Sequence, residues 1–198
     1  MNHPLQCRCG TLKGYVSHPE RASRGACYCR DCQAYAHFLG RAADILDDKG
    51  GTDVVATLPK YVTFTQGFEA LACMSLTEDG LLRWYARCCN TPIGNTRRDY
   101  RVSFVGLVHT CLEDASRSLE SSFGPVRMRV NTKSAKGEMR TMPISTIAAI
   151  LLFMIALIRA RLDGSYKRTP FFQPDRGTPV IPSKVLTRNE RERVMDAV

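Results

Sequence analysis

The sequence predicts a mainly β N-terminal half built from antiparallel sheets, followed by an α-helical and irregular C-terminal extension. Short alternating apolar segments, separated by turn residues, fill the first hundred residues. A continuous apolar stretch over 144–158 has the length of a helix, and four prolines follow Thr169. Because the character of the chain changes near residue 99, we expect one domain over 1–99 and a helical extension with a Pro-rich tail over 100–198.

Four segments of the first half alternate or cluster apolar residues in the manner of strands. They are 12–16, 54–58, 61–64 and 81–85. Gly50-Gly51, Pro59 and Gly67 stand between them as turn residues. Residues 31–43 lack this pattern, so we expect a helical or irregular insert there.

Helical signals dominate the second half. The apolar run 102–112 is compatible with a helix. Pro143 suits a first helical turn, and Gly164 can end the helix that follows. Thr187 with Glu190 three positions later predicts a capping box and a short terminal helix.

The stretch 147–158 is apolar throughout, so its helix has no polar stripe and should be covered nearly all round. A helix over the fifteen residues 144–158 rises about 22 Å, which is short of the roughly 30 Å hydrocarbon core of a bilayer. We therefore expect no membrane partner. The helix should pack between the N-terminal domain and the tail, or against its copy in a homodimer formed through 143–163.

The formal net charge is +9, and it is concentrated in the second half. Residues 1–99 hold 12 Lys and Arg against 10 Asp and Glu, whereas residues 100–198 hold 16 against 9. No aromatic residues are interleaved with the basic ones around 127–140, as a nucleic-acid track would require. We expect a solvated basic surface and no nucleic-acid partner.

Nine cysteines in 198 residues are the main departure from an average composition. The N-terminus has no basic-then-apolar signal peptide, so we expect a cytoplasmic protein, where thiols stay reduced. Clustered cysteines in that compartment more often bind metal than form disulfides. Cys73 and Cys111 stand alone in apolar surroundings and are expected in the core, and neither His18 nor His109 has a visible partner.

The remaining cysteines fall into three groups, Cys7 and Cys9, then Cys27, Cys29 and Cys32, then Cys88 and Cys89. The first group with Cys88 or Cys89 would close a structural four-ligand zinc site. The central three leave one position free, as catalytic zinc sites do. A fourth ligand for them is the alternative, and His37 is the nearest candidate. About two zinc ions per chain are predicted.

These groups carry a family resemblance over residues 5–96. Cys7-Arg8-Cys9-Gly10, Cys27-Tyr28-Cys29-Arg30-Asp31-Cys32 and Cys89-Asn90-Thr91-Pro92 resemble the motifs of the glutathione-dependent formaldehyde-activating enzyme / centromere protein V family. The resemblance implies an Mss4-like zinc fold, structural zinc on Cys7, Cys9 and Cys89, and a substrate-facing zinc on the central triad.

The resemblance also implies a function, a zinc-dependent carbon–sulfur lyase-like enzyme acting on a thiol or thiol adduct such as glutathione. In that case Cys27, Cys29 and Cys32 form the catalytic site, and Asp31 is the nearest candidate acid–base. The alternative is a zinc-stabilised, non-catalytic binding module with a basic partner-binding surface.

The chain departs from the family pattern at two positions. Ala86 stands where the family has a further cysteine, and Cys88 is the obvious substitute. Adjacent ligands are awkward in an extended strand, whose successive side chains point to opposite faces. A turn beginning at Arg87 would bring both sulfurs to one metal. Tyr28 replaces the usual histidine, which weakens the case for formaldehyde as the substrate.

Overall fold

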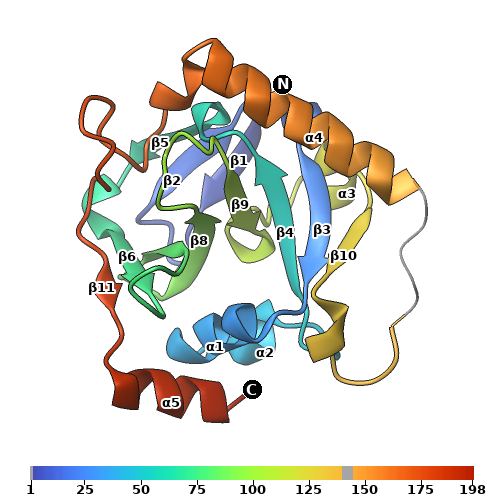
Figure 1. The fold of residues 1–198 in the computed structure, drawn as a ribbon, viewed down its shortest axis with the longest axis vertical. Helices are drawn as coiled ribbons and strands as arrows, with labels where there is room; N and C mark the ends of the chain where they lie inside the picture. Colours follow the sequence, from blue (N-terminus) through green and yellow to red (C-terminus); the bar gives the residue numbers. More distant parts are fainter. Residues whose placement is uncertain (1, 140–144) are drawn as a thin grey trace.

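A mixed sheet of eight strands forms the frame of the protein. The computed structural model describes residues 2–139 and 145–198 (Figure 1). The strand order is β10-β3-β4-β9-β8-β7-β6-β11, and every neighbouring pair is antiparallel except the two at its edges, β10-β3 and β6-β11. The strands are β3 (Ser23–Cys27), β4 (Thr52–Thr57), β6 (Leu71–Ser75), β7 (Leu82–Ala86), β8 (Thr91–Thr96), β9 (Val105–Val108), β10 (Met128–Val130) and β11 (Lys184–Val185).

A second, antiparallel sheet has the order β1-β2-β5, with β1 (His3–Gln6), β2 (Lys13–Val16) and β5 (Val62–Gln66). Gly14 is required in β2, because a Cβ there would lie 2.1 Å from the carbonyl oxygen of Thr63. The main core lies between the two sheets and includes Leu5, Leu12, Leu71 and Trp84, all nearly inaccessible to solvent. The prediction of a mainly β protein with antiparallel sheets is confirmed.

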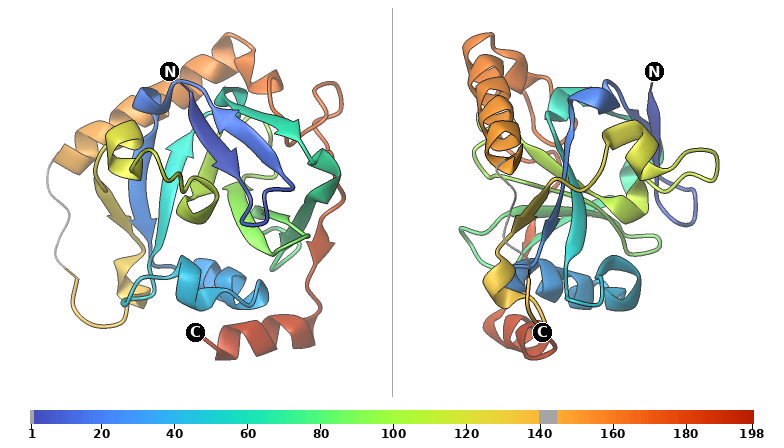
Figure 2. Two further views of the ribbon diagram at one scale, coloured as in Figure 1. Left: turned by 180° about the vertical axis from the view of Figure 1, so that it is seen from behind. Right: turned by 90° about the vertical axis from the view of Figure 1, so that its right-hand side faces the viewer.

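Helices lie at two opposite ends of the molecule. The helices α1 (Arg30–Phe38), α2 (Ala42–Ile45) and α5 (Arg188–Asp196) lie near one end, and α4 (Ser145–Leu162) runs along the other (Figures 1 and 2). A short helix, α3 (Leu119–Phe123), precedes β10. The helical insert expected over 31–43 is therefore confirmed as α1 and α2, and the predicted capping box of α5 is present.

The prediction of a helical run over 102–112 is wrong. Its centre is strand β9, whose four residues are all buried between β4 and β8, and only a single 3-10 turn follows over His109–Cys111. A strand buried on both faces is a continuous apolar run, which periodicity alone does not distinguish from a buried helix. Because β9 lies in the middle of the large sheet, this sheet continues past residue 99, where the sequence predicted the end of the first domain.

The C-terminal tail also contributes to the core of the N-terminal half. Phe171 and Phe172 are buried, and their ring centroids lie 5.2 Å and 6.3 Å from that of Trp84. Beyond them, β11 pairs in parallel with β6, and α5 packs beside α1. The tail thus passes around one edge of the large sheet.

The predicted apolar helix exists as α4. Its expected packing between the N-terminal domain and the tail is wrong for its described residues, whereas the alternative cover by a second copy stays a prediction. Ile147, Leu152 and Leu162 are 58%, 69% and 82% exposed, whereas Ala160 on the inner side is 1% exposed. The tail passes to other parts of the molecule instead of over the helix (Figure 1). Pro143 and Ile144 lie outside the described residues. Within the described residues, no helix is both long and apolar enough to cross a membrane.

Candidate metal centres

The sulfurs of Cys7, Cys9, Cys88 and Cys89 meet within 4.8 Å of one another. Cys7 and Cys9 lie in the turn between β1 and β2, where the Cys7 carbonyl accepts from the Gly10 amide and Gly10 has a φ of +73°. The backbone amide of Leu12 donates to Cys7 Sγ at 3.3 Å. This turn therefore presents two sulfurs on one side.

The adjacent pair comes together through the turn 87–90, which connects β7 to β8. The amide of Cys89 donates to the carbonyl of Ala86, and Asn90 has a left-handed φ of +53°. The backbone there is not extended, so the alternation that would separate the two side chains does not apply. Cys88 and Cys89 therefore both reach the cluster, through the turn that the sequence offered as one of the alternatives.

The distances in this cluster suit a tetrahedral metal. A metal with sulfur bonds of about 2.3 Å implies sulfur–sulfur edges of about 3.8 Å. Cys88 Sγ lies 3.3 Å from Cys9 Sγ, 3.8 Å from Cys7 Sγ and 3.8 Å from Cys89 Sγ. Four sulfurs with these spacings can hold a metal ion with every position filled by protein.

The second cluster consists of Cys27, Cys29 and Cys32, also within 4.8 Å of one another. Cys27 ends β3, Cys29 is the N-cap of α1, and Cys32 lies in its first turn. The Cys32 amide donates to Cys29 Sγ at 3.4 Å, because an N-cap side chain accepts from a free amide of the first turn. A strand that leads directly into a capped helix therefore gathers all three sulfurs.

This triad also fits a metal. Cys27 Sγ lies 3.4 Å from Cys29 Sγ, close to a tetrahedral edge. Hydrogen bonds from the thiols of Cys29 and Cys32 lower the pKa of Cys27 to about 2, while they raise the pKa of Cys32. The cluster thus holds a thiolate readily. Among the described residues no histidine, carboxylate or further cysteine joins it, and His37 lies outside it.

Arg83 is a component of this site that the sequence analysis missed. It lies on β7, is only 2% exposed, and places Nη1 3.8 Å from Cys32 Sγ and 3.2 Å from Asn95 Oδ1. Its guanidinium also lies over the ring of Tyr35, 5.1 Å from the centroid. Burial opposes its charge, but Cys32, Tyr35 and Cys29 together outweigh that effect, and the pKa of Arg83 is raised. The sequence signal for a buried arginine was its position between two large apolar residues, Leu82 and Trp84.

The side chains beside the triad complete its surroundings. Asn131 directs Nδ2 to Cys27 Sγ at 3.5 Å from the turn after β10. Tyr28 is buried, and its hydroxyl donates to Asp47 Oδ2 at 3.0 Å. Tyr28 is therefore engaged with a carboxylate outside the cluster.

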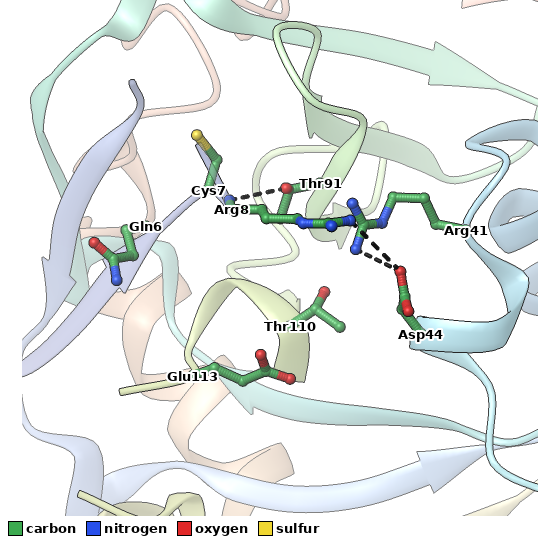
Figure 3. A pocket seen from close by; sticks show the side chains of 8 residues that line it. All are labelled: Gln6, Cys7, Arg8, Arg41, Asp44, Thr91, Thr110 and Glu113. Carbon is green, nitrogen blue, oxygen red and sulfur yellow. Dashed lines mark hydrogen bonds and ion pairs between the residues drawn. The ribbon is translucent and has the colours of Figure 1, made fainter. Parts of the chain in front are cut away.

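A polar hollow of about 430 Å³ lies beside the four-cysteine cluster (Figure 3). Arg41 forms a 2.5 Å ion pair with Asp44, and the guanidinium of Arg8 lies against the same carboxylate at 4.0 Å. The hollow is also lined by Gln6, Cys7, Thr91, Thr110 and Glu113. Because that cluster can fill all four metal positions with sulfur, the hollow adjoins no free coordination position.

Comparison with known proteins places the chain in one family. The model of "Family of unknown function (DUF6151)" matches residues 1–182. The protein belongs to this family. No curated protein matches the chain. The family match therefore covers both cysteine clusters, β9, α4 and the phenylalanines that pack on Trp84, and it leaves the activity open.

The remaining predicted residues are placed as follows. Cys73 and Cys111 are both buried in the core, as predicted, and burial raises the pKa of Cys73 to about 12. His18 forms a 3.2 Å contact with Glu20 at the surface. The Nδ1 atom of His109 is buried without a hydrogen-bond partner among the described residues. Within the described residues, neither His18 nor His109 belongs to a cluster of potential metal ligands.

Proposed function

We propose that this protein is a zinc-dependent enzyme of the carbon–sulfur lyase type with an Mss4-like fold, acting on a thiol or thiol adduct of the glutathione class. The observation that supports it best is the triad of Cys27, Cys29 and Cys32. Its three sulfurs fit one metal, and no fourth side chain of ligand type joins them in the described residues. Three protein ligands and one free position are typical of catalytic zinc.

In this proposal the two clusters have different roles. Cys7, Cys9, Cys88 and Cys89 would hold a structural zinc and join the start of the chain to the β7–β8 turn. The triad would hold the second zinc, which would supply a Lewis acid for a substrate sulfur in its thiolate form. The reaction would join the thiol to an aldehyde carbon. A carbon–sulfur bond forms, the carbonyl double bond becomes a single bond, and the thiol proton ends on the oxygen.

Arg83 would balance the charge of the loaded triad. Three thiolates and a divalent cation carry a net charge of −1, and the buried guanidinium lies 3.8 Å from Cys32 Sγ. Asp31 remains the candidate acid–base, since it lies in the first turn of α1 between the ligands Cys29 and Cys32. Its carboxylate is about half exposed and lies 4.0 Å from Arg83 Nη2.

A second candidate function is a non-catalytic binding module in which both metals are structural. It is favoured by Asn131, whose side-chain amide lies against Cys27. The oxygen and nitrogen of an amide exchange places when the group flips. A flipped Asn131 would direct Oδ1 toward the triad and could fill the fourth position.

The full chain loaded with cobalt(II) distinguishes the two functions. Thiolate-bound cobalt is coloured, so a thiol that enters a free position at the triad changes the visible spectrum. We expect glutathione to change the spectrum of the wild type and of Asn131→Ala equally, and to leave that of Cys29→Ser unchanged. A response that only Asn131→Ala gives would show that Asn131 closes the site, and it would support the binding module.

A further inference from the structure

The outer face of α4 is an exposed apolar arc. Its members are Ile147, Leu151, Leu152, Met154, Ile155, Ile158 and Leu162, each between 45% and 82% exposed. At 3.6 residues per turn these seven positions fall within about 160° of the helix circumference. Ala160 lies on the opposite side and is buried, and Phe153 packs there against Phe104. The arc therefore points directly away from the protein.

The arc has a basic border. Arg161 is exposed and borders the arc on one side, and exposed Arg159 lies near its other margin, between Ile155 and Leu152. The helix α4 itself contains no acidic residue, and Asp163 directly follows it. At the C-terminal end of the helix, a hollow is lined by Arg101, Arg161 and Lys167. The paired rings of Tyr100 and Tyr166 also line it, together with Pro174 and Asp175. Three basic side chains against one carboxylate give this end of α4 a positive charge.

We propose that α4 lies in the headgroup boundary of an anionic lipid bilayer. The arc would enter the acyl region, while Arg159, Arg161 and the basic hollow would contact lipid phosphates. Interfacial helices combine an apolar face with basic residues at its border and tyrosines at headgroup depth. The apolar part of α4 is too short to span a bilayer, but a helix that lies in the membrane surface does not need that length.

A second copy of the chain fits the arc less well. Two parallel α4 helices would place Arg159 opposite Arg159. Two antiparallel helices would place each arginine opposite an apolar position near Ile147, because no carboxylate lies within α4. An anionic surface would cover the apolar arc and also neutralise the arginines near its margins.

Vesicle sedimentation of the full, metal-loaded chain tests this proposal. We expect binding to mixed phosphatidylglycerol and phosphatidylcholine vesicles, and little binding to phosphatidylcholine alone. The double variant Leu151→Gln/Ile155→Gln should reduce binding by at least about tenfold. Arg159→Gln and Arg161→Gln should each reduce it about fivefold. Phe68→Gln and Arg188→Gln, at exposed sites elsewhere, are the matched controls.

Light scattering without lipid measures the mass of the particle in solution and tests the alternative that a second copy covers the arc. A dimer that the arc variants dissociate, with no vesicle binding by the wild type, would show that a second copy covers the arc. Equal binding to neutral and anionic vesicles would also overturn the proposal. Unchanged metal content and near-ultraviolet circular dichroism would show that the variants fold. The result is independent of the proposed enzyme activity, because α4 contributes no residue to either metal cluster.

Discussion

The guanidinium of Arg83 lies 3.8 Å from the sulfur of Cys32, and both side chains are buried. A buried charge is costly unless it is paired and hydrogen-bonded. Arg83 meets that condition through Cys32 and Asn95, so the strand β7 and the helix α1 are joined by a charged contact. The stability of the triad and that of the sheet are therefore coupled.

Replacing Arg83 should test this coupling. Removal of one partner of a buried ion pair typically costs about 3–5 kcal/mol, so Arg83→Met should lower the free energy of unfolding by that amount. It should also reduce metal retention at the triad. Urea denaturation and elemental analysis measure the two effects.

Arg83→Lys is the conservative variant, because it keeps the positive charge but loses the planar guanidinium group with its several hydrogen-bond donors. It should restore metal retention in part. Arg188→Met, at an exposed arginine of α5, should change neither quantity. If Arg83→Met retained wild-type metal content, Arg83 would be only a structural residue of the core.

The two cysteine clusters should differ in their contribution to folding. Cys7→Ser should lower the thermal midpoint more than Cys29→Ser, since the four-cysteine cluster joins the β1–β2 turn to the β7–β8 turn and structural metal contributes folding free energy. Each variant should lose one of two metal ions per chain. Calorimetry and metal analysis provide the measurements.

Cys73→Ala is the matched control, because Cys73 is buried but lies in neither cluster. It should retain both metal ions. Equal thermal losses for Cys7→Ser and Cys29→Ser would contradict the division into a structural and a substrate-facing site.

The tail should be necessary for the stability of the whole sheet. Phe171 is fully buried against Trp84 and Phe64, so Phe171→Ala should cost about 3–5 kcal/mol. Chemical denaturation followed by Trp84 fluorescence measures this loss. Phe68→Ala, at a ring that is 41% exposed, should cost far less. Two separate unfolding transitions in the wild type would instead indicate an independent extension.

The start of α5 should depend on pH. Hydrogen bonds from Lys184 and from the Thr187 amide and hydroxyl lower the pKa of Glu190 to about 2. The ordinary pKa of Glu is about 4.3, so the capping box stabilises α5 above that pH and is lost as the pH falls toward 2. Hydrogen exchange of the α5 amides should follow this course. Glu190→Gln should remove this pH dependence of exchange, and Glu192→Gln should preserve it.

The sequence predicted those parts of the fold whose signals are local. Alternating segments identified β2, β4, β5 and β7, and the capping box identified the start of α5. The cysteine spacing identified the triad and the two pairs of the other cluster, because tight turns and a helix cap place nearby residues together. The meeting of the two distant pairs was predicted from the four ligands that a structural zinc requires.

The features that the sequence did not predict depend on distant parts of the chain. β9 is a strand because β4 and β8 lie on both sides of it. The tail does not cover α4, because it packs on Trp84 instead. Arg83 was missed because its partner, Cys32, lies on another element.

The central position of β9 also determines when the sheet can form during synthesis. β3 and β4 pair with each other, and β6, β7 and β8 form a separate meander, but only β9 joins the two groups. A nascent chain that ends before Val105 therefore presents two partial sheets, each with an unpaired edge that another chain can pair with. Until Val108 has emerged from the ribosome, the facing edges of β4 and β8 have no partner, and the nascent chain can aggregate through them.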